Sequence, residues 1–253
     1  MKEIIRKCIL FLSICLFIYS AFNLIKAYID YKEISDQQEE LVDQFVEPIK
    51  TETDKEDNKE EVAIIDPYSR FIDFRALNNL NKDVIGWIYI PDTRVDEPIL
   101  KGRNNDSYLR TNLYGEYMVA GTIFIDENDG KDFNDDKTII YGHNMTNGTR
   151  FGQLSKFQRF EFFDEHPNVY IYKPDGSIYV YDIFVAKTID ASSPLYYDIE
   201  SYSQFVSDIQ NGAPQARSIP KKKAPIILLS TCVNSDLTRR YVISARLKEI
   251  VKK

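Results

Sequence analysis

The most apolar part of the chain is a run of eighteen uncharged residues near the N-terminus, residues 8–25, rich in Leu, Ile and Phe. About this many residues are needed for a helix to cross the hydrocarbon core of a bilayer. Lys2, Arg6 and Lys7 precede the run, so the N-terminus should stay in the cytoplasm and the rest of the chain should face outward. A cleaved signal peptide is the alternative, but bulky Tyr19 stands where a cleavage site needs a small side chain. We therefore predict an uncleaved single-pass anchor in residues 1–30.

A second pattern occupies residues 31–65. Ile34, Leu41, Phe45 and Val46 recur at spacings typical of a helix, which predicts a short amphipathic helix just outside the membrane. The following run TETDKEDNKEE, residues 51–61, carries no side chain that could enter a core and its charges repel one another. We interpret residues 31–65 as a juxtamembrane helix followed by a solvated stalk.

From residue 66 to the C-terminus the pattern is that of a packed domain. DPYSRFIDFRALNNL places Phe71, Phe74, Arg75 and Leu77 at helical spacing and predicts one helix at the start of the domain. Strands dominate afterwards: short runs rich in β-branched and aromatic residues are separated by Gly, Asn, Asp and Pro. These runs are VIGWIYI, TIFID, TIIYG, NVYIYK, SIYVYDIFVAKTI, PIILLST and YVISARLKEI.

Two local signals add detail to this domain. KPDGS, residues 173–177, is a turn sequence that makes the flanking runs a hairpin. Residues 201–210, which begin with a capping serine, predict a helix inserted before the PIILLST strand. Seven or eight short strands with few helices suggest a closed β-barrel or a sandwich.

Charge is distributed unevenly. Residues 31–66 hold thirteen acidic residues and four lysines, a net charge of −9, whereas the first thirty residues carry +2. Because the whole chain carries −7, the segment from Pro67 onward is neutral. A folded domain without net positive charge gives no indication that nucleic acid is a partner.

The folded domain has one cysteine, Cys232, because Cys8 and Cys15 fall in the membrane segment. A disulfide within the outward part is therefore excluded, and the thiol is either a small buried apolar group or a nucleophile. A nucleophilic thiol needs a base or a positive field nearby. His143 follows an apolar strand where the chain turns and is a better candidate base than His166, which precedes a proline. Arg240 begins the strand after Cys232, and a loop of seven residues, 233–239, can bring guanidinium and sulfur together.

Three segments resemble a known family. LLSTC followed eight residues later by Arg240 in TRRYVISARL, together with the upstream YGHNM, is similar to the sortases, the membrane-anchored cysteine transpeptidases of Gram-positive bacteria. VIGWIYIPDTRVDEPIL, NNDSYLRTNLYGEYMVAGTIFIDEND and the predicted helix before the cysteine strand resemble class B in particular. The leading Thr of the family motif is Leu228 here, which leaves the three catalytic positions unchanged. The resemblance implies a β-barrel catalytic domain over residues 66–253.

The resemblance also implies roles for individual residues. Cys232 would form a thioester with the threonine carbonyl of a sorting signal, His143 would transfer protons and Arg240 would stabilise the oxyanion, with Arg239 as the alternative. Transfer of the acyl group to a peptidoglycan precursor amine would anchor secreted surface proteins to the cell wall, and an Asn-Pro-type motif is favoured in the signal. The residues that match substrate-binding positions of class B are Asn105, Leu109, Tyr141 and Ser230.

Two other functions are compatible with a lone thiol in an outward domain. A non-catalytic surface module with a structural thiol and a hydrolytic cysteine peptidase are the competing functions. The acidic run DENDGKDFNDD, residues 126–136, departs from the EF-hand calcium pattern and is interpreted as a solvated turn. No glycine loop for phosphates and no paired Cys or His ligands occur, so we predict no nucleotide cofactor and no metal.

Overall fold

A computed structural model describes residues 2–47, 66–197, 199, 201–233 and 236–252. The barrel strands are β3 (Val84–Tyr89), β4 (Asp96–Leu100), β5 (Ile123–Ile125), β6 (Lys137–Tyr141), β7 (Asn168–Tyr172), β8 (Ile178–Asp190), β10 (Ile226–Val233) and β11 (Asp236–Val251). Short strands outside the ring are β1 (Val46–Glu47), β2 (Phe71–Ile72) and β9 (Gln215–Ala216). The helices are α1 (Lys2–Phe45), α2 (Phe74–Leu80), α3 (Phe160–Glu165), α4 (Tyr202–Gln210) and the 3₁₀ turns η1 (Leu154–Gln158) and η2 (Pro194–Tyr196).

The eight barrel strands form a closed ring in the order β11–β10–β6–β5–β4–β3–β7–β8. The ring closes because β8 also pairs with β11 along most of its length. Two neighbouring pairs, β6 with β10 and β4 with β5, are parallel, and the other pairs are antiparallel. Closure leaves no free edge on these strands, and it confirms the barrel while excluding the sandwich. The predicted hairpin is also confirmed, because Tyr172 pairs with Ile178 across a turn that contains Gly176 at φ +82°.

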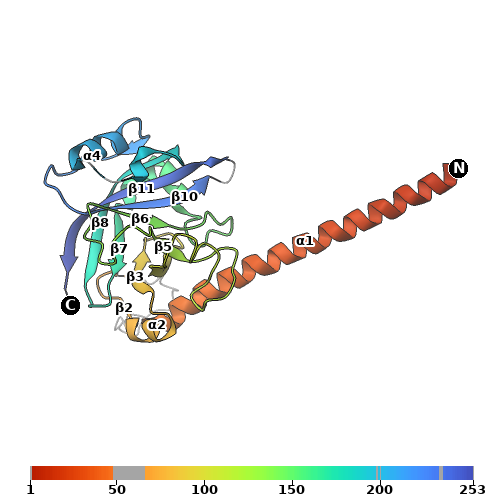
Figure 1. The fold of residues 1–253 in the computed structure, drawn as a ribbon, viewed down its shortest axis with the longest axis horizontal. Helices are drawn as coiled ribbons and strands as arrows, with labels where there is room; N and C mark the ends of the chain where they lie inside the picture. The colour runs from red at the N-terminus through yellow and green to blue at the C-terminus, as the bar shows by residue number, and fades with distance from the viewer. Residues whose placement is uncertain (1, 48–65, 198, 200, 234–235, 253) are drawn as a thin grey trace, which may run out of the picture.

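Aliphatic and aromatic side chains from alternating strand positions fill the barrel. Ile88, Ile140, Tyr181 and Ile243 are members of this interior cluster. The outer faces of the strands are covered by helices: α1 and α2 pack on one side, and α4 on another (Figure 1). The barrel therefore has an apolar interior and two apolar outer faces, which is why its strands read as nearly continuous apolar runs.

The two predicted helices of the domain are present, with one correction. The helix α4 begins directly after its cap Ser201, whose side chain accepts a hydrogen bond from the Gln204 N–H. The helix α2 begins later than expected, because Asp73 is its cap and accepts from the Ala76 N–H at 2.9 Å. Phe71, assigned to this helix from its spacing, lies instead in β2, where it pairs with Glu47.

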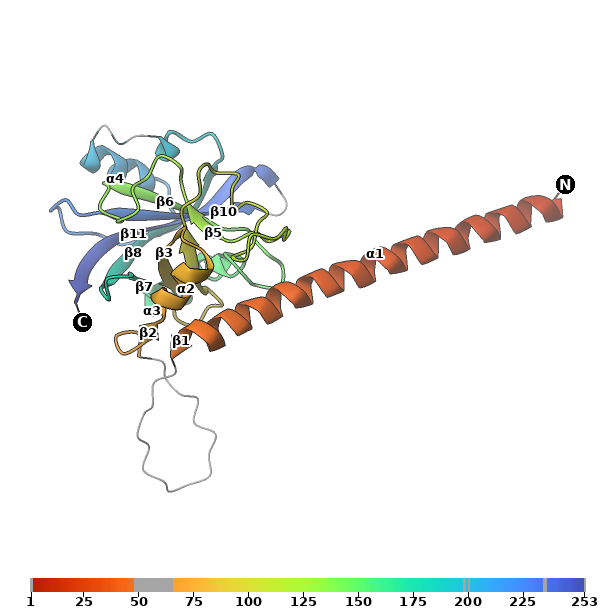
Figure 2. The same cartoon turned by 60° about the horizontal axis from the view of Figure 1, so that its bottom comes forward.

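The N-terminal helix α1 is longer than either pattern suggested. It continues without a break from Lys2 to Phe45, so the anchor and the juxtamembrane helix are one element that leaves the barrel as a rod (Figures 1 and 2). It is long and apolar enough to cross a membrane, and the side chains of residues 8–25 are exposed apart from partly buried Ala21. Ile34, Leu41 and Phe45 are buried against the domain. The predicted division at residues 30 and 65 stays a prediction, and the expected stalk sequence lies outside the described residues.

Candidate active site

Cys232 and Arg240 lie directly opposite each other on the neighbouring antiparallel strands β10 and β11. Cys232 is the second-last residue of β10, its thiol is free, and it pairs in register with Arg240 of β11. Residues directly opposite in an antiparallel pair point to the same face. The sequence placed a loop of residues 233–239 between them, but β11 already begins at Asp236 and Val233 pairs with it. Strand pairing, rather than a loop of seven residues, therefore places the two side chains on the same face.

The same pairing separates Arg240 from its alternative. Arg239 immediately precedes Arg240 on β11, so its side chain points to the opposite face of the strand. Arg239 is exposed, whereas Arg240 is partly buried. Nη1 of Arg240 donates to the carbonyl oxygens of Leu237 at 2.7 Å and Arg239 at 3.0 Å, which fixes the direction of the guanidinium. This geometry favours Arg240 as the cation beside the thiol.

The loop that carries His143 lies against the cysteine strand. Tyr141 at the end of β6 pairs with Ser230 of β10, and because these strands are parallel, His143 and Cys232 each follow two residues later. The Gly142 N–H donates to the Ser230 carbonyl at 3.3 Å, and Nδ2 of Asn144 donates to the Cys232 carbonyl at 2.9 Å. His143 is thus held between two residues that are each bonded to the cysteine strand.

Burial and neighbouring charges favour a neutral His143. Burial lowers the pKa of its imidazole, the nearby Arg110 and Arg150 guanidinium groups lower it further, and the hydrogen bond to Leu109 acts in the opposite direction. Nε2 lies 2.8 Å from the Leu109 carbonyl oxygen, which can only accept, so Nε2 carries the proton and Nδ1 is the basic nitrogen. A neutral imidazole at pH 7 can accept a proton from a thiol. The ring bonds Leu109 rather than Cys232 in this structure.

His166 has a different environment. It ends α3, stacks on Phe162 with ring centroids 3.9 Å apart, and its Nε2 lies 2.9 Å from a carboxylate oxygen of Asp92. These contacts account for the side chain structurally and involve none of the predicted site residues.

The four residues expected to bind substrate lie around the same end of the barrel. Nδ2 of Asn105 and the hydroxyl of Tyr141 both donate to Oδ2 of Asp126, at 2.9 and 3.0 Å. Leu109 is 38% exposed and its carbonyl holds His143. The hydroxyl of Ser230 is 2.8 Å from that of Tyr196. Asp126 thus joins Asn105 to Tyr141, and Tyr196 bonds Ser230; the sequence did not reveal the part of either residue in the site.

The acidic run at residues 126–136 borders this region. A cavity of about 560 Å³ opens beside Asp126 and is bounded by Lys137 and Tyr196. Burial raises the pKa of Asp129 to about 6, although its carboxylate accepts from the Ile139 N–H. Asp126 also accepts from Asn105 and Tyr141, two of the residues expected to bind substrate, so the run is more than a solvated turn. In the part of the chain that the structure describes, no group of three or more His, Cys, Asp or Glu is placed to hold a metal ion.

A buried ion pair supports the His143 loop from inside. Arg150 closes that loop through a backbone bridge to Asn144, and the Phe151 N–H donates to the His143 carbonyl at 3.0 Å. The guanidinium of Arg150 pairs with the carboxylate of Glu97 on β4, and both side chains are almost completely buried. Gly142 is needed here because a Cβ at this position would meet the Phe151 ring at 2.8 Å.

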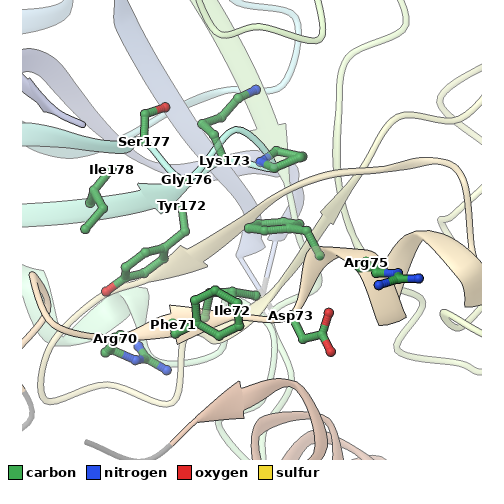
Figure 3. Close-up of a pocket in the computed structure, with 12 residues that line it drawn as sticks. Arg70, Phe71, Ile72, Asp73, Arg75, Tyr172, Lys173, Gly176, Ser177 and Ile178 are labelled. Carbon is green, nitrogen blue, oxygen red and sulfur yellow. The ribbon is translucent and has the colours of Figure 1, made fainter. Parts of the chain in front are cut away.

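Another cavity lies away from this chemistry. It has a volume of about 290 Å³ and sits between β2 and the β7–β8 hairpin, where Phe71, Arg75, Tyr172 and Lys173 line it (Figure 3). None of the predicted site residues borders it.

Comparison with known proteins agrees with the geometry. A family model described as the sortase domain matches residues 88–248. Sortase B of Listeria monocytogenes is 35% identical over 186 residues, which cover 69% of this chain and 74% of that protein.

Solved structures of class B sortases have the same fold. Sortase B from Bacillus anthracis matches with a TM-score of 0.67 and 27% identity over 88% of this chain and 100% of that one. A sortase B–substrate complex from Staphylococcus aureus matches with a TM-score of 0.63 and 29% identity over 71% of this chain and 84% of that one. A sortase B complexed with triglycine matches with a TM-score of 0.63 and 28% identity over 71% of this chain and 85% of that one. This chain belongs to the sortase family and is a cysteine transpeptidase of class B.

Proposed function

We propose that Cys232, His143 and Arg240 carry the transpeptidation, with Cys232 as nucleophile. The Cys232 thiol gives its proton to His143, and the thiolate attacks the carbonyl carbon of the scissile peptide bond. The C–N bond breaks, the leaving amine takes the proton from His143, and the acyl group remains on sulfur as a thioester. An incoming amine then attacks the thioester and loses a proton to His143, which returns it to the departing thiolate of Cys232. The observation that carries this proposal is the in-register pairing of Cys232 with Arg240 beside the His143 loop.

Arg240 is assigned to the oxyanion. The carbonyl oxygen becomes negative in both tetrahedral intermediates, and a guanidinium on the face of the thiol stabilises that charge without losing a proton of its own. The fixed direction of Nη1 supports this role, because a preorganised donor avoids the cost of reorientation during the reaction.

The acyl donor is proposed to be the C-terminal sorting signal of secreted surface proteins. Asn105, Leu109, Tyr141 and Ser230 would line its groove. Asp126 would hold Asn105 and Tyr141 in place, and Tyr196 would hold Ser230. The solved complex of a related sortase B with a substrate supports the binding of a substrate by this fold.

The acceptor is proposed to be an amine of a peptidoglycan precursor. The complex of a sortase B with triglycine supports a glycine-like amine as the attacking group. Both partners would be held at the outer face of the cell membrane. There α1 would cross once, with Lys2, Arg6 and Lys7 in the cytoplasm and the catalytic domain outside.

A competition between water and amine tests this function. Full-length protein in detergent is incubated with fluorogenic sorting pentapeptides, including Asn-Pro-type motifs, with and without triglycine. We expect cleavage of at least one peptide and, with triglycine, a peptide–triglycine conjugate that replaces the hydrolysed product. Cleavage with the same hydrolysed product at every triglycine concentration would assign the chain to hydrolysis instead.

A further inference from the structure

The position of the membrane surface follows from α1. Residues 8–25 span about 27 Å at 1.5 Å per residue, close to the roughly 30 Å thickness of a hydrocarbon core. The headgroup layer on each side adds about 5–7 Å, or roughly three to five helical residues. Lys26 to Asp30 therefore lie in the outer headgroup layer if α1 is the anchor.

One loop of the catalytic domain reaches this level. A cleft of about 360 Å³ separates α1 from the residues around Tyr117, and Lys26 and Asp30 line one side of it while Tyr117 and Val119 line the other. Tyr117 is 77% exposed and Val119 is 38% exposed, although both are side chains that gain free energy by leaving water. We name these two residues the membrane-facing patch.

Backbone hydrogen bonds and a buried methionine hold the patch in place. The Met118 N–H donates to the Arg110 carbonyl at 3.0 Å, and Tyr117 forms a backbone bridge with Thr111. Met118 itself is buried in a small cluster with Ile34 of α1. The patch is thus fixed to the helix that determines where the membrane lies.

Tyrosine is suited to this position. Its ring is apolar and its hydroxyl is polar, and Tyr and Trp are enriched where hydrocarbon meets water. The patch is too small to bind a bilayer strongly alone. Attachment to a membrane helix makes its insertion an intramolecular step, so a weak intrinsic affinity is sufficient.

We propose that Tyr117 and Val119 insert into the lipid headgroup layer and hold the catalytic domain against the membrane from which α1 emerges. This inference rests on the proposed role of α1 as anchor. The connection between β4 and β5, which bears the patch, also contains Leu109, whose carbonyl bonds His143. Docking would therefore hold the mouth of the active site near the bilayer, where substrates with membrane tails are concentrated.

Tryptophan fluorescence in vesicles tests the docking. The only native tryptophan, Trp87, is fully buried and provides a constant background from the parent protein. Four variants, each with one added tryptophan, are made in the full chain and reconstituted in phosphatidylcholine vesicles with or without lipids brominated near the headgroup end of the acyl chain. Tyr117→Trp and Val119→Trp probe the patch, and Phe17→Trp probes the anchor. Phe71→Trp is the matched control, because Phe71 is 53% exposed and pairs with Glu47, just past the end of α1 at Phe45, which lies about 28 Å along the helix from Lys26.

We expect brominated lipid to reduce the added emission of Phe17→Trp, Tyr117→Trp and Val119→Trp, and to leave Phe71→Trp unchanged. Quenching of Phe17→Trp with no loss at either patch position would overturn the docking while leaving the anchor intact. No quenching at any position would overturn the anchor and the docking together. Equal quenching of Phe71→Trp and Tyr117→Trp would contradict a specific patch, since the whole domain would then contact lipid.

Discussion

Replacing Glu97 by glutamine should destabilise the domain and slow catalysis, because it leaves Arg150 charged and buried. The exposed fractions of the Glu97 and Arg150 side chains are 0% and 2%. Removal of one partner from such a buried pair costs about 3–5 kcal/mol of unfolding free energy. At 2–4 °C per kcal/mol for a chain of this size, Tm should fall by about 6–20 °C.

The kinetic effect follows from the position of Arg150. Its backbone adopts a left-handed conformation, φ +53°, that is unfavourable for a residue with a Cβ, and Glu97 holds it there by accepting from both its backbone N–H and its guanidinium. Loosening this residue loosens the loop that carries His143. A displacement of about 1 Å can reduce a rate on the order of a hundredfold, so we expect kcat to fall more than KM rises.

Urea unfolding and peptide cleavage below the Tm of the variant measure the two effects. The charge-free double variant Glu97→Leu/Arg150→Met serves as the control, because replacing a buried pair by apolar groups usually restores stability. We expect it to recover most of the unfolding free energy while kcat stays low. An unfolding free energy of Glu97→Gln within about 0.5 kcal/mol of the parent, the range of ordinary surface substitutions, would refute this reasoning.

Three further predictions follow from the site and from α1. Arg240→Ala should lower kcat by about 10²–10³, as removal of an oxyanion donor does, whereas Arg239→Ala should cleave peptide at nearly the parent rate. Equal losses of kcat in the two variants would contradict the assignment of Arg240, rather than Arg239, to the face of the thiol. The NMR titration of His143, assigned with the help of His166→Gln, should have its midpoint below the ordinary 6.5, and Arg110→Gln should raise that midpoint by removing a like charge. A midpoint at or above 6.5 would show that burial does not control this imidazole. Leu41→Ala should cost about 2–5 kcal/mol in urea unfolding because the side chain is buried against the domain, while Glu39→Ala, which breaks an exposed ion pair with Arg94, should cost less than about 1 kcal/mol.

The strands that the sequence predicted correctly are those with a strong local signal, a short run of apolar and β-branched residues. The runs ending in Tyr141 and Thr231 are apolar and β-branched, and they are buried on both faces in the structure. DEPIL, which forms β4, was not recognised as a strand, because a proline and two acids are unfavourable in an isolated strand. These residues are accommodated through distant partners: Asp96 binds Arg70, and Glu97 binds Arg150.

The same difference between local signals and distant contacts applies to the candidate site. Cys232, His143 and Arg240 could be selected because their types are rare in the chain or they stand at strand ends, and the structure brings their segments together. Asp126 and Tyr196 could not, because their importance comes from hydrogen bonds to residues 15–34 positions away. No local pattern reports such contacts. The continuity of α1 was also not evident, because amphipathic spacing after an apolar run does not indicate whether the helix is interrupted.

Intact-mass spectrometry of a trapped reaction shows whether Cys232 is the residue that carries the acyl group. Full-length protein is mixed with a cleavable sorting peptide in the absence of amine, quenched with acid, and the adduct is located by peptide mapping. We expect one acyl group on Cys232, absent from Cys232→Ala and discharged as a peptide conjugate when triglycine is added before the quench. Conjugate formation by Cys232→Ala at the parent rate, or an acyl group on any other residue, would contradict the role of Cys232 as nucleophile.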